Sequence, residues 1–187
     1  MKKKSNIIGA IFCGREGQKA EKSERSLAHN RILMEEILNT LAPFCKEVVL
    51  VGQVKQIPDH FSHLKIVPNN YDHCGHLGNI EALLNSDLAP EYLTAPSDLH
   101  NPDPKIFKLL MSHEGQSPVI VSYKNKTHPL IGLYPASLKA IATQHIAYNN
   151  LSMDNFLATC QAECIDITNI LGKDLMNVKS EEHKIKK

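Results

Sequence analysis

Five short apolar runs, rich in β-branched residues, constrain the fold of this chain more than any other feature. Each run contains or adjoins a Gly, Pro or Asn, and together they cover residues 7–13, 47–52, 64–67, 91–95 and 118–123. Between them, apolar residues recur at spacings of three and four over 32–41, 77–84 and 106–110. Buried strands that alternate with helices of this length predict a mostly parallel sheet with helices on both faces. The expected fold class is therefore α/β with three layers.

The ends of the predicted helices carry recognisable signals. Pro43 should end the first helix, and Asp103 and Pro104 suit the cap and first turn of the third. After residue 123 the alternation loosens, and we expect a strand over 130–134, a helix over 136–146 and a late strand over 164–167.

Length and composition exclude several classes of protein. The 187 residues predict one domain over 1–187, with the Lys-rich end, 180–187, as a flexible basic tail. An apolar content of 42% excludes a disordered chain, and a net charge of +1 gives no reason to expect nucleic acid or a membrane as partner. The run 7–13 is too short to span a membrane, and no signal-peptide pattern follows it, so we expect a cytoplasmic protein. Its five scattered cysteines should be free thiols.

The residues that follow each strand are the first candidates for a site, because ligands of open parallel sheets bind beyond the carboxyl ends of the strands. Cys13 and Gly14 follow the first strand, and the cations Arg15, Lys19 and Lys22 come soon after. A glycine there lets backbone amides approach a phosphate, which these cations would neutralise. The spacing matches neither the dinucleotide fingerprint nor the P-loop, and a solvated, charged connection is the alternative.

Weaker candidates for ligand-binding residues follow the second and third strands. Gln53 follows Gly52, and its amide suits the edge of a base. The third strand leads to Gly75 and Gly78, whose spacing at a helix start suggests backbone close to an anion. A zinc site is a weaker alternative for this segment, because three ligands within four residues do not easily surround one ion; these are His73, Cys74 and His76.

Asp98 stands at the tip of the fourth strand, just past Pro96. Mg²⁺ uses one or two carboxylates together with phosphate oxygens and water, so Asp98 is placed to hold Mg²⁺ between nucleotide phosphates. The alternative is that Asp98 only caps the turn into the following helix.

Six segments in order give the chain a family resemblance over nearly its whole length. They are IIGAIFCG, LAPFCKEVVLVG, GHLGNIEALL, YLTAPSDLHNPDPKIFKLL, HPLIGLYPASLKAI and DLMNVKSEEH. In this order they resemble the molybdenum cofactor guanylyltransferases and their nucleotidyltransferase relatives. The resemblance implies a Rossmann-like sheet of the nucleotide-diphospho-sugar transferase type. It also implies transfer of GMP from Mg-GTP to molybdopterin, with release of pyrophosphate.

The resemblance assigns roles segment by segment. Lys22 and Arg15 would act in catalysis by stabilising the pyrophosphate, although gapless counting from the next helix places Ser23 where Lys22 is assigned. Asp98 would hold Mg²⁺. His128 and Asn177 would contact the acceptor. The nucleotide would be bound by Cys13, Gly14, Lys22, Gln53, Asn69, Gly75, Gly78 and Asp98.

Several residues depart from the family pattern. The loop after the first strand has one glycine where the family has two, and His76 replaces a proline. Pro68 or Asn69 stands where an acidic residue is usual, and Lys179 replaces a second Asn. Two alternatives therefore stay open: another small phosphorylated acceptor, or an inactive homologue that binds nucleotide or a partner. The expected partners are GTP and molybdopterin, together with molybdoenzymes or other cofactor-biosynthesis proteins, in a monomer or small homo-oligomer.

Overall fold

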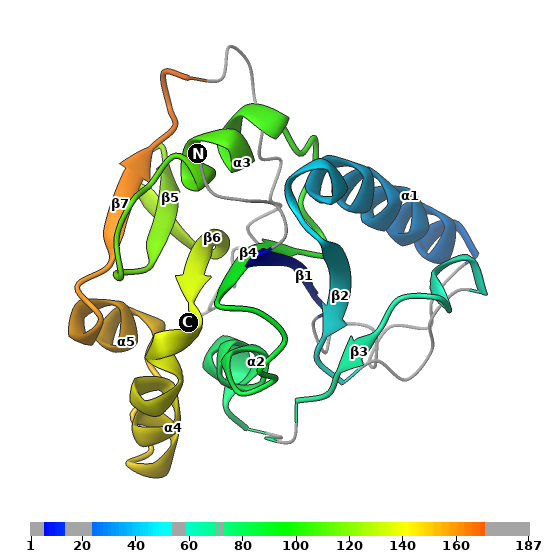
Figure 1. Ribbon diagram of the computed structural model, residues 1–187. Helices are drawn as coiled ribbons and strands as arrows, with labels where there is room; N and C mark the ends of the chain where they lie inside the picture. The colour runs from blue at the N-terminus through cyan, green and yellow to red at the C-terminus, as the bar shows by residue number, and fades with distance from the viewer. Residues whose placement is uncertain (1–5, 14–23, 54–58, 70, 72, 171–187) are drawn as a thin grey trace, which may run out of the picture.

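One sheet organises the computed structural model, which describes residues 6–13, 24–53, 59–69, 71 and 73–170. Within these residues seven strands form the order β3-β2-β1-β4-β6-β5-β7 (Figure 1). Neighbouring strands run parallel except for β6, which is antiparallel to both β4 and β5. The strands are β1 (Ile7–Phe12), β2 (Glu47–Val51), β3 (Ile66–Val67), β4 (Glu91–Pro96), β5 (Val119–Tyr123), β6 (Lys126–Pro135) and β7 (Glu163–Asp166).

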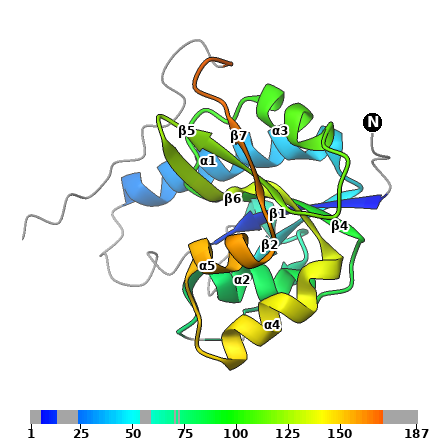
Figure 2. The ribbon, with the colours of Figure 1, turned by 90° about the vertical axis from the view of Figure 1, so that its left-hand side faces the viewer.

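Helices cover both faces of the sheet (Figure 2). On one face lie α1 (Glu24–Leu41) and α3 (Pro104–Met111). On the other lie α2 (Gly75–Leu84), α4 (Lys139–Ala147) and α5 (Met153–Thr159). Short 3₁₀ helices occupy Ala42–Phe44, Asp59–Phe61 and Ala136–Leu138. The predicted three-layer α/β class is therefore confirmed.

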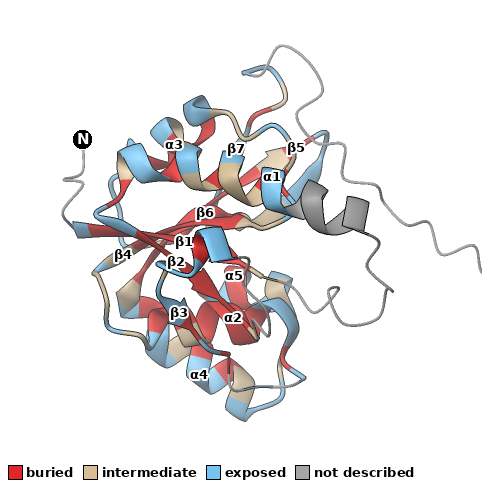
Figure 3. Cartoon of the chain, turned by 90° about the vertical axis from the view of Figure 1, so that its right-hand side faces the viewer, coloured by how far each residue is buried: buried red, intermediate tan, exposed pale blue. Residues whose placement is uncertain are grey.

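The central strand β1 divides its side chains between two cores. All six of its residues are buried, as the red strands in Figure 3 show. Ile7 and Ile11 pack towards α1 and α3, whereas Ile8, Ala10 and Phe12 pack towards α2, α4 and α5. Successive side chains of a strand point to opposite faces, and a strand buried on both faces needs an apolar residue at every position. This is why the run reads as continuously apolar.

Most predicted elements are confirmed, with differences at their ends. Pro43 lies in a 3₁₀ turn directly after α1, and the carboxylate of Asp103 caps α3 by accepting from the backbone N–H of Lys105 at 2.7 Å. The predicted strand 130–134 is the second half of a longer strand, β6, which starts at Lys126. Helix α5 is not among the predicted elements; the hydroxyl of Ser152 caps it by accepting from the N–H of Asn155. No helix in the described ranges is long and apolar enough to cross a membrane.

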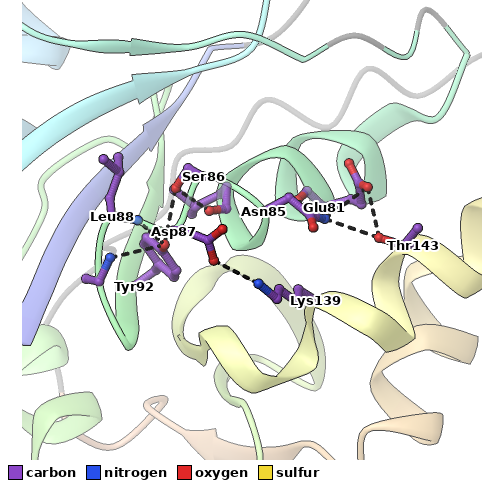
Figure 4. A network of polar contacts seen from close by, with 10 residues as sticks. Glu81, Asn85, Ser86, Asp87, Leu88, Tyr92, Lys139 and Thr143 are labelled. Atoms are coloured by element: carbon purple, nitrogen blue, oxygen red, sulfur yellow. Dashed lines mark hydrogen bonds and ion pairs between the residues drawn. The ribbon is translucent and has the colours of Figure 1, made fainter.

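Helix α2 is tied to α4 by polar contacts (Figure 4). The carboxylate of Glu81, which is buried, accepts hydrogen bonds at 3.0 Å from the amide of Asn85 and from the hydroxyl of Thr143. Lys139 forms an ion pair with Asp87 at 2.8 Å. A buried carboxylate is tolerated when donors surround it, so these bonds hold the end of α2 against α4.

Tyr92 on β4 closes the loop that follows α2. Its ring is fully buried, and its hydroxyl oxygen accepts from the backbone N–H groups of Leu88 at 3.1 Å and Ala89 at 3.3 Å. The same oxygen lies 3.1 Å from the hydroxyl of Ser86 (Figure 4). One phenol oxygen therefore accepts from two backbone N–H groups of the α2–β4 connection.

We expect Tyr92→Phe to lower the free energy of unfolding by about 1–3 kcal/mol, because it leaves two backbone N–H groups without their acceptor. Urea denaturation measures this change. Tyr148→Phe removes the same atom from a residue that is 77% exposed and should leave the midpoint unchanged. Equal midpoints for the two variants would contradict the role given to the Tyr92 hydroxyl.

Candidate functional site at the carboxyl edge of the sheet

Four parallel strands end in line at one edge of the sheet. The register pairs Phe12 of β1 with Val51 of β2 and with Pro96 of β4, and it pairs Val51 with Val67 of β3. Strands β1 and β4 are therefore neighbours in the sheet. The loops after β1, β2, β3 and β4 therefore start side by side, which is where open parallel sheets bind ligands.

Backbone hydrogen bonds carry this alignment past the strand ends. The N–H of Cys13 donates to the carbonyl of Val51 at 2.8 Å, and that of Gly52 donates to the carbonyl of Val67 at 3.0 Å. The N–H of Ser97 donates to the carbonyl of Phe12 at 2.9 Å. The first residue of the loops after β1, β2 and β4 is thus fixed by a neighbouring strand.

Gly52 allows the loops after β1 and β2 to meet. Its φ is +127°, and a Cβ atom there would lie 2.5 Å from the carbonyl oxygen of Cys13. No residue with a side chain fits at this distance, so glycine is required. Gln53, which follows directly, is half-buried at the same edge.

Asn69 joins the loop after β3 to helix α2. It is 9% exposed; its Oδ1 accepts from the N–H of Tyr71 at 2.8 Å, and its Nδ2 donates to Oδ1 of Asn79 at 2.8 Å. A Cβ on Gly78 would lie 2.9 Å from Nδ2 of Asn69, so the missing side chain of Gly78 makes room for this contact. The contacts of Asn69 seat the loop on the first turns of α2.

The start of α2 is open to a ligand. Gly75, its first residue, has a φ of +51°, and a Cβ built on it would meet no atom within 4 Å. The N-cap residue Cys74 makes no side-chain cap bond, and the first turn holds no acidic residue. Burial, and then the charge of Glu81, raise the pKa of the Cys74 thiol. No negative side chain therefore caps the positive end of the helix dipole, which can accept an anion instead.

Asp98 lies in the turn after β4, where Leu99 donates its N–H to the carbonyl of Pro96 at 3.2 Å. Its side chain is exposed and makes no hydrogen bond or ion pair to another described residue. Helix α3 is capped by Asp103 rather than by Asp98. The carboxylate of Asp98 thus remains available to a ligand.

Metal binding by protein side chains alone has no support in the described part of the chain, where no three His, Cys, Asp or Glu residues converge. The zinc alternative for His73, Cys74 and His76 therefore fails. Mg²⁺ needs fewer protein ligands, because it keeps waters and binds phosphate oxygens beside one or two carboxylates. A single exposed carboxylate at a phosphate-accepting edge, as in Asp98, fits that requirement.

His128 reaches the same edge from the antiparallel strand β6. The register pairs Thr94 of β4 with Gly132 of β6 and Glu91 with Pro135, so the first residues of β6 lie towards the edge where β4 ends. His128 is half-buried, and burial together with the positive charge of Lys126 lowers the pKa of its imidazole. The ring is therefore neutral at pH 7 and can donate one hydrogen bond and accept another.

The thiol of Cys13 has low nucleophilic reactivity. All five cysteines are free, as predicted, and Cys13 is half-buried. Burial raises the pKa of its thiol to about 11. A neutral thiol is a poor nucleophile, so Cys13 contributes its backbone and its shape rather than covalent chemistry.

Two groups of residues complete the comparison with the sequence predictions. The structure brings to one edge Cys13, Gln53, Asn69, Gly75, Gly78, Asp98 and His128. Outside the described residues lie Gly14, Arg15, Lys22 and Asn177. Sequence reasoning missed Asn79, although a polar residue in the apolar pattern of α2, beside Leu77 and Ile80, was a usable signal.

A cleft of 390 Å³ lies between β3 and the outer side of α2. It adjoins Pro68 and Tyr71, on either side of Asn69, but its lining contains none of the predicted site residues. The cleft therefore flanks the carboxyl edge and is separate from it.

Two curated proteins are similar to the chain over most of its length, whereas no protein-family model matches it. A protein of Flavobacterium johnsoniae is 25% identical over 174 residues, which is 91% of this chain and 90% of that protein. A protein of Carboxydothermus hydrogenoformans is 22% identical over 163 residues, or 86% of this chain and 82% of that protein. Both are named "probable molybdenum cofactor guanylyltransferase".

Solved structures share the fold at lower identity. A protein of Aquifex aeolicus has a TM-score of 0.72 with 14% identity, covering 92% of this chain and 95% of its own. Molybdopterin-guanine dinucleotide biosynthesis protein A of Archaeoglobus fulgidus has a TM-score of 0.63 with 17% identity, covering 86% and 83%. Glucosyl-3-phosphoglycerate synthase of Mycobacterium tuberculosis, solved with UDP, has a TM-score of 0.54 with 11% identity, covering 91% and 73%.

The sheet is thus of the nucleotide-diphospho-sugar transferase type, as the resemblance implied. The sequence likeness extends over nearly the whole chain and agrees with this fold. The chain is thus similar over most of its length to two proteins named as probable molybdenum cofactor guanylyltransferases, and it shares the fold of a molybdopterin-guanine dinucleotide biosynthesis protein.

Proposed function

We propose that the protein transfers GMP from Mg-GTP to the phosphate of molybdopterin and releases pyrophosphate. The observation that carries this proposal is the convergence of four strand ends on one edge, where the uncapped start of α2 and the carboxylate of Asp98 both lie. A helix N-terminus that can accept an anion and a nearby carboxylate that can hold a metal ion together suit a nucleoside triphosphate. The names of the two curated relatives support guanine and molybdopterin as the reactants.

Each group would bind a substrate or neutralise charge on its phosphates, since phosphoryl transfer needs little covalent chemistry from the protein. The backbone near Cys13, Gly14 and Gly75 would bind the nucleotide. Asp98 would hold Mg²⁺, which when bound neutralises charge on the phosphates. Lys22 and Arg15 would stabilise the leaving pyrophosphate.

The acceptor would approach from the side of β6. His128 is neutral, so it would position the acceptor phosphate through a hydrogen bond from its ring N–H. Asn177 is the second proposed contact to the acceptor. A nucleophilic side chain is unnecessary, because the acceptor phosphate itself attacks the α-phosphorus.

Turnover tests the proposal directly. Purified protein is given molybdopterin, Mg²⁺ and either GTP, CTP or ATP, and pyrophosphate release is followed over hours. We expect slow release with GTP. Release with GTP and a different phosphorylated acceptor, but not with molybdopterin, would reassign the acceptor. Nucleotide binding without release under any condition would favour an inactive binding protein.

We expect Asp98→Asn to abolish the increase in GTP affinity that Mg²⁺ produces, because the substitution removes the carboxylate but little volume. The free energy of unfolding should change by less than about 0.5 kcal/mol, as at most exposed positions. Isothermal titration of GTP with and without Mg²⁺, and thermal unfolding of the same samples, measure both effects. Asp154→Asn, an exposed residue in the first turn of α5, is the matched control. Retained magnesium dependence with lowered stability would show that Asp98 is structural.

We expect Gly75→Ala to weaken GTP binding about tenfold, because the methyl group enters open space at the start of α2. Its positive φ should also cost about 1–2 kcal/mol of stability. Gly75→Asn separates the two effects, because Asn tolerates this backbone conformation but is bulkier. If Gly75→Asn restores both stability and affinity, strain alone is responsible and a ligand does not approach Gly75.

A further inference from the structure

The hairpin between β5 and β6 stands at the carboxyl edge of the sheet. Thr94 of β4 and Ile120 of β5 both pair with Gly132 of β6, so β4 and β5 run in the same direction from one level. Beyond that level β4 leads to the turn that holds Asp98, and β5 leads to the hairpin turn. The two turns therefore lie at the same edge, with β6 between their strands.

His128 and Lys126 lie on one face of this hairpin. Their partners on β5 both belong to the core between the sheet and helices α1 and α3; they are Val121 and Tyr123, respectively. Residues that pair across antiparallel strands project to the same face, so His128 and Lys126 project to the side of α1 and α3. The turn that holds Asp98 leads into α3, on the same side of the sheet.

Lys126 and His128 suit a phosphate in two different ways. The side chain of Lys126 is exposed and makes no hydrogen bond or ion pair to another described residue. Burial, and then the positive charge of Lys126, lower the pKa of the His128 imidazole, so the ammonium is near enough to act on the ring. The cation supplies charge and the neutral imidazole supplies an N–H, and a phosphate accepts both.

A directed chain of hydrogen bonds ties the turn of this hairpin to the end of β7. The N–H of Lys124 donates to Oγ1 of Thr168 at 3.0 Å, and the hydroxyl of Thr168 donates to Oδ1 of Asp166 at 2.5 Å. The N–H of Thr168 donates to the same carboxylate oxygen at 2.9 Å. Because a backbone N–H can only donate, Oγ1 of Thr168 must accept from Lys124, and its proton is directed to Asp166. The bonds from the hydroxyl and the N–H of Thr168 lower the pKa of the Asp166 carboxyl, which is therefore charged at pH 7.

The hairpin turn does not need this tie for its own conformation. Lys124 and Asn125 have φ values of +50° and +60°, and a type I′ turn requires a positive φ at both of its central residues. Such a turn matches the twist of the two strands that it joins. The tie to β7 therefore fixes where the turn lies at the edge rather than whether it forms.

We propose that Asp166 and Thr168 are positioning residues, which hold the β5–β6 hairpin where it binds the phosphate of the acceptor. Lys126 and His128 are the groups that contact this phosphate. The inference rests on the proposed function, in which the acceptor approaches from the side of β6. A shift of the turn would move both contacts together, so loss of the tie weakens binding of the acceptor and leaves binding of the nucleotide unchanged.

Thr168→Val tests the tie, because valine keeps the shape of threonine but neither accepts from Lys124 nor donates to Asp166. We expect the KM for molybdopterin in the pyrophosphate-release assay to rise about tenfold, as for the loss of a hydrogen bond to a charged group, with little change in kcat. The Kd of Mg-GTP, from isothermal titration, should not change. Thr168→Ser keeps the hydroxyl and should restore the wild-type KM.

Two further variants separate positioning from a general loss of structure. Lys126→Ala should also raise the KM for molybdopterin about tenfold, and Thr168→Val should raise it less in that background than in the wild type, because both act on one contact. Thr159→Val is the matched control. It removes a bonded hydroxyl at the end of α5, just before β7 starts at the opposite edge of the sheet, and should keep the wild-type KM. Urea denaturation shows whether each variant is folded.

Each outcome supports or overturns the proposal. A wild-type KM for molybdopterin in folded Thr168→Val overturns the positioning role, and the proposed function stands. If Thr168→Val weakens GTP binding as much as it raises this KM, or if Thr168→Ser does not restore the KM, the tie is only structural and the proposal fails.

If Thr168→Val does not fold, Lys126→Ala decides: a raised KM for molybdopterin supports the proposal, and an unchanged KM overturns it. If the wild type releases no pyrophosphate with GTP and molybdopterin, the proposed function is itself overturned, and this proposal with it.

Discussion

The hydrogen-bonded alignment of four parallel strand ends is the constraint on which the rest of the site depends. Because Phe12 is in register with both Val51 and Pro96, the loops after β2 and β4 each start one strand spacing from the loop after β1. The backbone bonds from Cys13, Gly52 and Ser97 extend this order into the loops. A change that displaced β1 would move every candidate ligand-binding group together.

Helix α2 turns this alignment into a rigid platform. Near its start, Asn69 and Gly78 hold the loop after β3 against the first turns. Near its end, Glu81 accepts a hydrogen bond from Thr143 of α4, and the hydroxyl of Tyr92 accepts from two backbone N–H groups of the following loop. Since both ends are fixed to other elements, the open N-terminus at Gly75 keeps its position before any ligand arrives, and preorganised donors of this kind are the effective ones in catalysis.

The charges of the side chains at this edge suit a ligand that is itself negatively charged. The thiols of Cys13 and Cys74 are neutral because burial raises their pKa values, and the pKa of His128 is lowered. Among the described residues directly after the strand ends, Asp98 is a carboxylate, and it is exposed. Binding groups made of backbone N–H, amides and a carboxylate favour a phosphate and its metal over an apolar ligand.

The sequence alone predicted the α/β class, most of the strands and the position of Asp98, because these follow from local patterns: continuous apolar runs, helical spacing and residues that stand directly after a strand. It missed α5 and the antiparallel direction of β6, since periodicity carries no strand direction. It also missed the hydrogen bond between Asn69 and Asn79, because Asn69 is ten residues from Asn79, in the loop after β3. Local chemistry therefore determined which residues were candidates, and only the tertiary structure decided which of them meet, because hydrogen bonds between elements depend on register and packing rather than on spacing along the chain.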